Sequence, residues 1–332
     1  MDSVSQLALG AAVGVAVMGR RTALWKAAAW GAVAGTLPDL DVLIDHGNPV
    51  HNMVLHRAET HAPFWLTLFS LPFAAAIARV HGEWSQCKRW WLAMWLALVT
   101  HPLLDTMTVY GTQIGLPFTD RPYGVASVFI IDPLYTLPLL VGTALALARG
   151  SLRANAAGLA LSTAYLGWGV AAQTHVQRVA VDALAAQGLA AERVLVTPSA
   201  FNSIAWRVVV MQRDHYFEGF YSLLDAKPTV RFDRFERGSA LEPELRGIDG
   251  FERIARFSKG FYALRQDGTR VVVADLRMGQ EPAYTFSFAV AERASPARAL
   301  NVPQQVGSRP DVDRMLPWLL RRIGGDPTPP PR

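Results

Sequence analysis

Charged residues are distributed very unevenly along this chain of 332 residues. Residues 1–172 hold 19 charged side chains, whereas the shorter remainder, residues 173–332, holds 40. Because charged side chains are costly in lipid, a long stretch with so few of them is typical of a membrane domain. A hydrophobic share of 51% against 18% charged residues also excludes a disordered chain. The sequence therefore predicts a transmembrane domain over residues 1–172 and a soluble domain over residues 173–332.

Apolar stretches recur through the first half and are separated by short polar segments. They cover residues 4–18, 23–37, 64–80, 90–104, 127–148 and 155–172. Several are only 15–17 residues long, and a helix needs ~17–25 residues to cross a hydrocarbon core of roughly 30 Å. Tilted or partly re-entrant helices are therefore allowed. We expect an all-α polytopic membrane domain of about six helices, with Asp132-Pro133 marking a helix start.

Positive side chains follow every second apolar stretch. The connections concerned carry Arg20, Arg21 and Lys26, then Lys88 and Arg89, then Arg149 and Arg153. Such residues mark the cytoplasmic side. The N-terminus, residues 38–63, residues 105–126 and the soluble domain should then lie on the opposite side. A secretory signal peptide is the competing interpretation of the N-terminus, but residues 1–5 contain Asp2 and no Lys or Arg.

The second half has β-type patterning after a helical segment over residues 173–189. Runs rich in β-branched and aromatic residues cover 194–197, 204–211, 215–224, 230–235, 260–265, 270–275 and 284–290. Asp267-Gly268 between two of these runs predicts a hairpin. We expect a soluble β-rich (α+β) domain that ends in a frayed segment, residues 326–332, whose prolines cannot continue a helix.

Polar residues in the apolar half point to a metal. Six of the eight histidines precede residue 173. The single cysteine, Cys87, cannot form an internal disulfide or a thiolate cluster, so His and carboxylate side chains must hold any ion. Ionisable groups at membrane depth are expensive and indicate a functional site where they gather. Three groups qualify: Asp39 with Asp41, His56 with His61, and His101 with Asp105.

Each group also has a simpler interpretation. Asp39 and Asp41 point the same way on an extended backbone and could share one cation or bridge two, or they could cap the next helix. His56 and His61 would lie about 140° apart on a helix, so joint chelation requires one of them to precede the helix. The alternative is a pair of solvated loop histidines.

The third group, His101 with Asp105, has the i, i+4 spacing of residues on one helical face. Both could bind a metal, or Asp105 could orient the imidazole. A buried hydrogen bond without a metal is the alternative. The predicted topology places all three groups at one membrane face, and ligands of this kind suit Zn²⁺, Mn²⁺ or Fe²⁺, as one or two ions.

With these motifs in view, the chain resembles a family of predicted membrane-bound metal-dependent hydrolases of bacterial inner membranes. That family is distantly similar to zinc-dependent phospholipase C and P1-type nucleases. The resemblance spans roughly residues 1–172. It is carried by MDSVSQLALGAAVG at 1–14, GTLPDLDV at 35–42, HRAETH at 56–61, THPLLDTMTVYGTQ at 100–113 and DPLYTLPLL at 132–140. The tail, with FEGFYSLLD at 217–225 and VADLRMG at 273–279, resembles the extension of one branch of the family.

The resemblance implies an inner-membrane location, zinc as the first choice of metal, and a set of metal-binding positions. These positions are Asp39, Asp41, His56, His61, His101 and Asp105. Two departures stand out. Gln6 replaces a His that many relatives carry, which removes a possible ligand of a second metal. Ala58 and Ala62 replace a Gly and a Ser, which alters the local turn and removes a hydroxyl beside the site.

The expected function is hydrolysis of a phosphoester or other ester of an amphiphilic substrate by metal-activated water. Asp39 or Asp105 would accept the proton, Arg57 would bind an anionic substrate oxygen, and Tyr110 or Gln113 would orient it. We expect membrane lipids as partners and no nucleic acid, because the net charge of +5 comes without a basic run.

Two further classes of protein remain open at this stage. One is a non-catalytic metal-binding membrane scaffold whose soluble domain binds a partner protein. The other is a transporter, which would explain the intramembrane His and Asp residues. Transport sites usually lie near the midplane of the bilayer between repeats, however, whereas these residues gather at one face.

Overall fold

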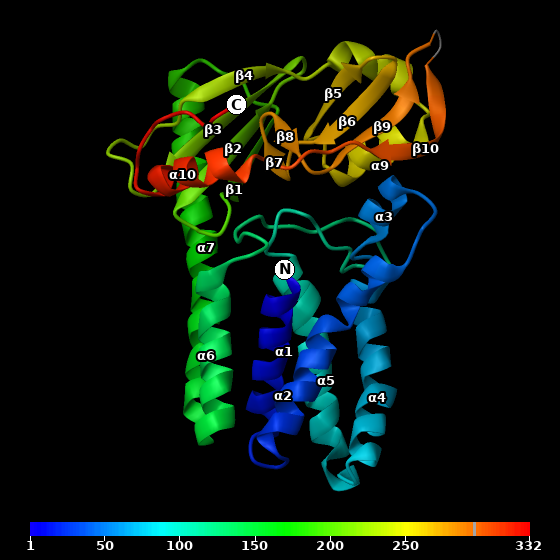
Figure 1. Ribbon diagram of the computed structural model, residues 1–332, viewed down its shortest axis with the longest axis vertical. Helices are drawn as coiled ribbons and strands as arrows, with labels where there is room; N and C mark the ends of the chain where they lie inside the picture. The colour runs from blue at the N-terminus through cyan, green and yellow to red at the C-terminus, as the bar shows by residue number, and fades with distance from the viewer. Residues whose placement is uncertain (295–296) are drawn as a thin grey trace. The chain divides into compact units, whose positions relative to one another are not determined.

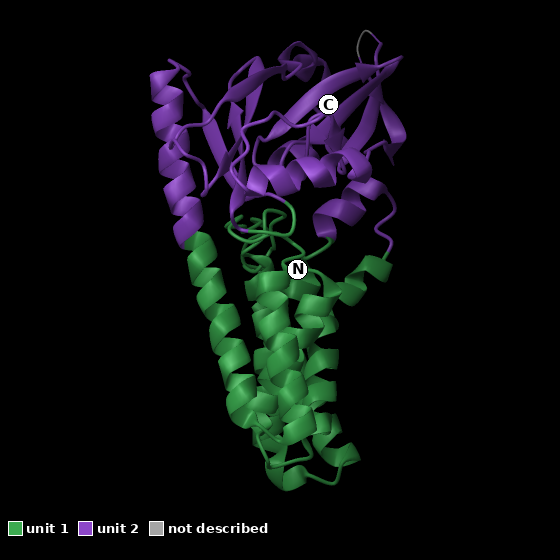
Figure 2. Ribbon diagram, turned by 60° about the vertical axis from the view of Figure 1, so that its left-hand side comes forward, with its two compact units in different colours: residues 1–44, 56–170, 200–202 green, residues 45–55, 171–199, 203–332 purple. Residues whose placement is uncertain are grey.

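A computed structural model of the chain describes residues 1–294 and 297–332. The chain forms two compact units (Figure 2). The first comprises residues 1–44, 56–170 and 200–202, and the second comprises residues 45–55, 171–199 and 203–332.

The first unit is a bundle of antiparallel helices (Figure 1). Its helices are α1 (Ser3–Met18), α2 (Leu24–Thr36), α4 (Pro63–Val80), α5 (Cys87–Asp105), α6 (Pro133–Arg149) and the first part of α7 (Leu152–Ala186). Each coincides with one predicted apolar stretch, so the helical first half is confirmed. Asp132 starts α6 as predicted, because its carboxylate accepts a hydrogen bond from the Leu134 backbone N–H at 3.1 Å.

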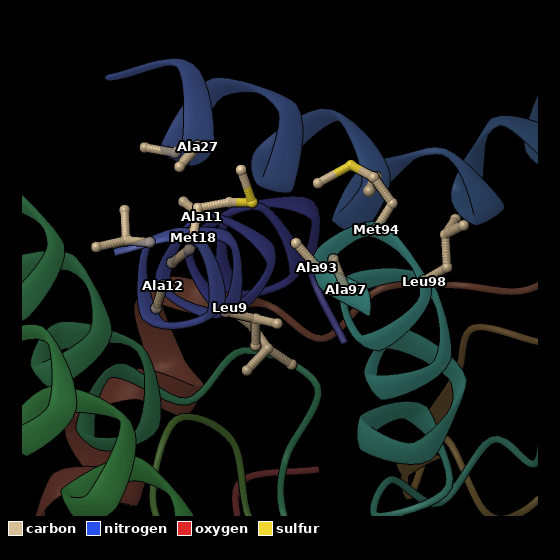
Figure 3. Close-up of a cluster of buried hydrophobic side chains, with 14 of the residues drawn as sticks. Leu9, Ala11, Ala12, Met18, Ala27, Ala93, Met94, Ala97 and Leu98 are labelled. Carbon is tan, nitrogen blue, oxygen red and sulfur yellow. The ribbon is translucent and has the colours of Figure 1, made fainter. Parts of the chain in front are cut away.

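Glycines bring α1 and α2 into backbone contact. A Cβ atom added to Gly10 would lie 2.1 Å from the carbonyl oxygen of Gly31, and one added to Gly35 would lie 2.5 Å from the carbonyl oxygen of Gln6. Such close approach is typical of small-residue interfaces between membrane helices. Alanine, methionine and leucine side chains also fill the adjoining core (Figure 3). The residues labelled there are Leu9, Ala11, Ala12 and Met18 of α1, Ala27 of α2, and Ala93, Met94, Ala97 and Leu98 of α5.

One helix in the described part of the chain, α4, is long and apolar enough to cross a membrane. The helices α1 and α6 are apolar but shorter. The outer face of α4 carries large exposed hydrophobic residues, among them Leu68 and Leu71, which are 50% and 52% exposed. The number of helices that cross a membrane therefore stays a prediction.

Connections at the two ends of the bundle differ in length. At one end, short turns join α1 to α2, α4 to α5 through η3 (Trp84–Gln86), and α6 to α7. At the other end, α2 is followed by η1 (Pro38–Leu43), α3 (Pro49–Leu55) and η2 (Glu59–His61), and α5 is followed by residues 106–132. All three candidate metal groups lie at this second end, where α2 and α5 finish and α4 begins (Figure 1).

The second unit contains two antiparallel sheets, which confirms a β-rich domain after the helical half. The first sheet has the order β1 (Arg193–Pro198), β2 (Ala205–Met211), β3 (His215–Ser222) and β4 (Phe232–Glu236). The second has the order β10 (Arg298–Gln305), β9 (Ser287–Glu292), β6 (Arg270–Asp275) and β5 (Tyr262–Asp267). Shorter elements are β7 (Gly279–Gln280), β8 (Ala283–Tyr284), η4 (Ser239–Leu241), α8 (Glu242–Leu245), α9 (Asp249–Phe257) and α10 (Val312–Ile323).

Strand β2 is buried on both faces. Trp206, Val208 and Val210 pack with residues of α7, while Val209 and Met211 pack with residues of the second sheet. The first sheet is therefore covered by α7 on one side and by the second sheet on the other. The predicted hairpin is confirmed, since Asp267 pairs with Arg270 across Gly268. The sequence did not reveal β10, an edge strand that contains Pro303.

The prediction of a frayed segment over residues 326–332 is wrong. The Trp318 indole donates a hydrogen bond to the Thr328 carbonyl at 2.8 Å, and the Arg332 guanidinium pairs with Asp233 at 2.9 Å. The same guanidinium lies 4.3 Å from the centre of the Phe235 ring. Prolines prevent a helix here, but these contacts hold the extended segment against the second unit.

Candidate metal centre

Four of the six predicted ligands converge at the end of the helical bundle. They are Asp39 of η1, His61 of η2, and His101 and Asp105 of α5. Each offers one ligand atom, and these atoms all lie within 4.8 Å of one another. His61, His101 and Asp105 are fully buried, whereas the side chain of Asp39 is 18% exposed. The i, i+4 spacing on α5 does put His101 and Asp105 on one face.

The separations between the four side chains suit a single small cation. The two Nε2 atoms of His61 and His101 are 3.1 Å apart. Each Nε2 lies 3.4–3.5 Å from Oδ1 of Asp39 and from Oδ2 of Asp105. Ligands about 2.0–2.1 Å from a tetrahedral zinc ion are about 3.3 Å from one another. The group could therefore hold one ion with little rearrangement.

Hydrogen bonds to the other ring nitrogens fix the orientation of both imidazoles. Nδ1 of His101 lies 2.6 Å from the Gly35 carbonyl oxygen, which can only accept, so this nitrogen carries the proton. The Thr60 hydroxyl donates to Asp41 at 2.7 Å, so its oxygen accepts from Nδ1 of His61 at 3.0 Å. Both Nε2 atoms then present lone pairs to each other, as metal-ligating histidines do. A cation or a shared proton must lie between them.

Asp105 also directs its Oδ2 atom at the space between the two Nε2 atoms. Its Oδ1 accepts hydrogen bonds from the amide of Gln6 at 3.0 Å and from the amino group of Met1. Its Oδ2 is buried without a hydrogen-bond partner among the described residues, although Nε of Arg57 lies 3.2 Å away. The Arg57 guanidinium thus compensates the charge of this carboxylate, while Oδ2 keeps a lone pair that could bind a further cation.

Asp41 and His56, the other two predicted ligands, lie beside the group of four. Asp41 accepts hydrogen bonds from the Arg57 backbone N–H at 3.0 Å and from the Thr60 hydroxyl, and its other oxygen lies 2.7 Å from Nδ1 of His56. Through these hydrogen bonds Asp41, a residue of η1, holds in place the turn that contains Arg57 and Thr60. The sequence-based prediction that Asp41 and His56 bind a metal directly would require them to give up these contacts.

Electrostatics within the cluster favour ionised groups. Burial by itself would raise the pKa of Asp39, but hydrogen bonds with His101 and His61 outweigh it and hold that pKa well below its usual range. Burial likewise opposes ionisation of Asp41, and hydrogen bonds with His56 and His61 keep its pKa low. Burial would lower the pKa of His61, but Asp105, Asp39 and Asp41 together raise it to about 9. Without a metal, His61 therefore holds a proton at neutral pH.

Arg57 is buried and faces Asp105 rather than solvent. Its guanidinium lies 5.0 Å from the centre of the Tyr110 ring and donates to the Thr108 hydroxyl at 3.3 Å. Its backbone has φ of +67°, a conformation that side chains other than Gly rarely adopt. The hydrogen bond from its N–H to Asp41 holds this conformation in place.

Three features of the site escaped sequence analysis. Thr60 was within a quoted motif but had no assigned role, although a hydroxyl next to a ligating His is a reasonable candidate for orienting it. Thr108 also lies within a motif named above, residues 100–113, and had no assigned role. No pattern pointed to the Gly35 carbonyl, because a backbone acceptor depends on where α2 ends rather than on side-chain chemistry.

Comparisons with known proteins concern the helical half. The model of a family described as YdjM inner membrane protein matches residues 1–176. The protein YfhP of Bacillus subtilis, described as uncharacterized, is 27% identical over 157 residues, which are 46% of this chain. The match covers 48% of YfhP, so the chain spans about half the length of this relative. No solved structure matches the chain.

Proposed function

The chain belongs to the YdjM inner membrane protein family, and on this premise we propose that it is a metal-dependent hydrolase of the bacterial inner membrane. Its substrate would be a phosphoester or another ester of an amphiphilic molecule. One observation carries the proposal: two imidazole Nε2 atoms face each other at 3.1 Å between two buried or half-buried carboxylates. Hydrogen bonds on the far side of each ring leave those nitrogens free to bind a cation.

Zinc is the metal that we assign to this group. Two imidazoles and two carboxylates without a thiolate suit Zn²⁺, and Mn²⁺ and Fe²⁺ are the alternatives. His61, His101, Asp39 and Asp105 would hold one ion. A second ion would need Asp41 and His56, whose facing atoms are already 2.7 Å apart. One ion per chain is therefore the proposed state.

A divalent cation held here would lower the pKa of a water molecule toward neutrality, which is the chemistry that ester hydrolysis requires. Asp39 is the partly exposed member of the group, so the open side of the site lies next to it. A water molecule could bind there as a fifth ligand. Oδ1 of Asp39 faces the imidazoles, so we assign to its other oxygen, Oδ2, the role of accepting the proton from that water. Arg57 and Asp105 are fully buried and paired. The Arg57 guanidinium would therefore stabilise the negative charge that develops on the substrate next to Asp105, and it would not reach into solvent.

The proposed protein crosses the membrane several times, with the site on the non-cytoplasmic side. The antiparallel helices support this orientation, because the short α1–α2, α4–α5 and α6–α7 turns lie at the opposite end of the bundle from η1 (Figure 1). Arg20 lies in the first of these turns, and Lys88 and Arg149 lie in helix ends next to the other two. The exposed hydrophobic residues along α4 support contact with lipid. In this arrangement the second unit would also be non-cytoplasmic.

The test is to purify the full chain in detergent, measure bound metal, and assay phosphoester and carboxylester lipids. His101→Ala and Asp105→Ala should lose both metal and hydrolysis. His215→Ala, which removes a histidine of the second unit, should keep both. Metal binding with no hydrolysis of any ester would instead favour a metal-binding scaffold, and absence of bound metal in the wild type would reject both functions.

A further inference from the structure

We propose that the substrate reaches the metal site from the lipid side and that an apolar rim beside the site binds its hydrocarbon chain. The rim consists of Leu40, Val42, Leu43, Ile44, Phe64 and Phe118. The inference rests on the proposed function and makes it more specific, because the substrate would have to be a membrane-resident amphiphile with an acyl or similar chain.

The 3₁₀ helix η1 carries a ligand next to part of the rim. With three residues per turn, residues three apart share a side. Pro38 and Asp41 share the buried side, whereas Leu40 and Leu43 share a side on which they are 54% and 79% exposed. Asp39 shares its side with Val42, which is 71% exposed, and Ile44, the residue after η1, is 51% exposed. The helix therefore places Asp39 in the cluster directly beside exposed aliphatic side chains.

The start of α4 continues this rim. This helix begins at Pro63, two residues after the ligand His61. Phe64 packs edge-on against Phe118, with 5.8 Å between ring centres, and the two rings are 42% and 83% exposed. Both aromatic rings thus border the segment that supplies the buried imidazole.

The outer surface of α4 indicates that lipid rather than water covers the rim. Exposed apolar side chains continue from Phe64 along α4 through Trp65, Leu68 and Leu71. This helix is also the one in the described chain that is long and apolar enough to span a bilayer. Phe64 belongs both to this surface and to the rim, so hydrocarbon that covers α4 would also reach the rim at Phe64. The exposed charge of Asp45 directly after Ile44 marks where contact with water begins.

Lipid explains this exposure better than water does. Removing apolar surface from water lowers the free energy by about 25 cal/mol per Å². Four aliphatic side chains that faced water would therefore destabilise the chain, whereas contact with lipid hydrocarbon would avoid this destabilisation. A chain lying along the rim would place its polar head group next to Asp39, the exposed ligand.

Spin-label accessibility tests the location of the rim directly. The chain has one cysteine, so a Cys87→Ser background allows single labels at chosen sites. Leu43→Cys is compared in lipid nanodiscs with Leu71→Cys, on the outer face of α4, and with Ser85→Cys, in the exposed α4–α5 turn. The label at 43 should be accessible to oxygen and lose access to a water-soluble nickel complex, as at 71. Nickel access like that at 85 would overturn the proposal.

Hydrolysis of a lipid and of a soluble phosphoester tests the rim separately from the proposed metal-dependent function. The probes are dioleoyl phosphatidic acid in vesicles and p-nitrophenyl phosphate in solution. Leu40→Asn and Leu43→Asn should raise KM for the lipid about tenfold each, and leave KM for the soluble ester and the bound metal unchanged. Equal effects on both probes would reject the rim. Hydrolysis that survives His101→Ala would reject the metal-dependent function, and the spin labels would still decide the location of the rim.

Discussion

The Nε2 atoms of His61 and His101 lie 3.1 Å apart in the interior of the helical unit, and the other nitrogen of each ring already has a hydrogen-bond acceptor. Two neutral imidazoles in this arrangement repel each other through their lone pairs. Only a positive charge between them, a proton or a metal ion, makes the arrangement favourable. Asp39 and Asp105 close the group on the remaining sides.

Asp41 should tune the metal site without binding the metal. Asp41→Asn removes the charge that holds His56 and the turn of Arg57, and outer partners of this kind typically change affinity about 10–100-fold. Chelator competition on the purified chain measures the effect. Asp45→Asn, a change of an exposed carboxylate nearby, is the matched control. Complete loss of metal in Asp41→Asn, as in His101→Ala, would make Asp41 a ligand.

Metal affinity should rise with pH. The pKa of His61 is raised to about 9 in the metal-free chain, so below that pH a cation must displace one proton from the imidazole. Affinity should gain about tenfold per pH unit between pH 7 and about 9 and level off above. The same raised pKa means that the imidazolium stabilises the metal-free fold below pH about 6.5 and that this contribution is lost through pH 9.

Isothermal titration of zinc at several pH values in buffers of different ionisation enthalpy measures this proton release. An affinity that does not change between pH 7 and 9 would contradict the assigned role of His61.

Gly31→Ala should destabilise the helical unit. A Cβ atom there would lie 2.2 Å from the Gly10 carbonyl oxygen, so α1 and α2 must move apart. Overpacking of this kind typically costs 1–3 kcal/mol, which should appear as a lower midpoint of thermal unfolding in detergent. Gly167→Ala in α7 is the control, because nothing lies within 4 Å of its added Cβ. Equal midpoints for the two variants would refute close packing of α1 on α2.

The ion pair of Arg207 and Glu218 should stabilise the fold of the second unit. They are buried and 2.7 Å apart, so Arg207→Met leaves the Glu218 carboxylate with only the more distant Arg332, at 3.7 Å, and should cost up to about 3–5 kcal/mol. The double change Arg207→Met with Glu218→Leu should cost less than the single one. Hydrogen exchange of β2 in the full chain reports the difference. Arg231→Met, which breaks an exposed pair with Asp233, is the control, and an equal effect there would disprove the buried pair's role.

Sequence patterns predicted the elements well because apolar periodicity decides them. The long helices of the first half and most strands followed from it, whereas β10, the docked segment near Trp318 and the helices α3, α9 and α10 did not. An exposed edge strand with a proline has weak periodicity, and the segment is held by tertiary contacts with Trp318 and Arg332 rather than by local preference.

The sequence singled out the four side chains that come together, but it did not distinguish them from Asp41 and His56. The i, i+4 spacing placed His101 with Asp105, but spacing could not bring Asp39 and His61 to them from separate segments. It also could not distinguish Asp41, which binds a backbone N–H and a hydroxyl, from Asp39, which faces the imidazoles. That difference depends on the turn at Arg57, whose positive φ no pattern of residue types revealed.

X-ray absorption spectroscopy of the zinc-loaded full chain tests the central claim most directly. The account predicts one zinc per chain with two imidazole nitrogens and carboxylate oxygens at about 2.0–2.2 Å, and loss of the imidazole signal in His101→Ala but not in His215→Ala. A spectrum without imidazole scattering, or one that His101→Ala leaves unchanged, would contradict it.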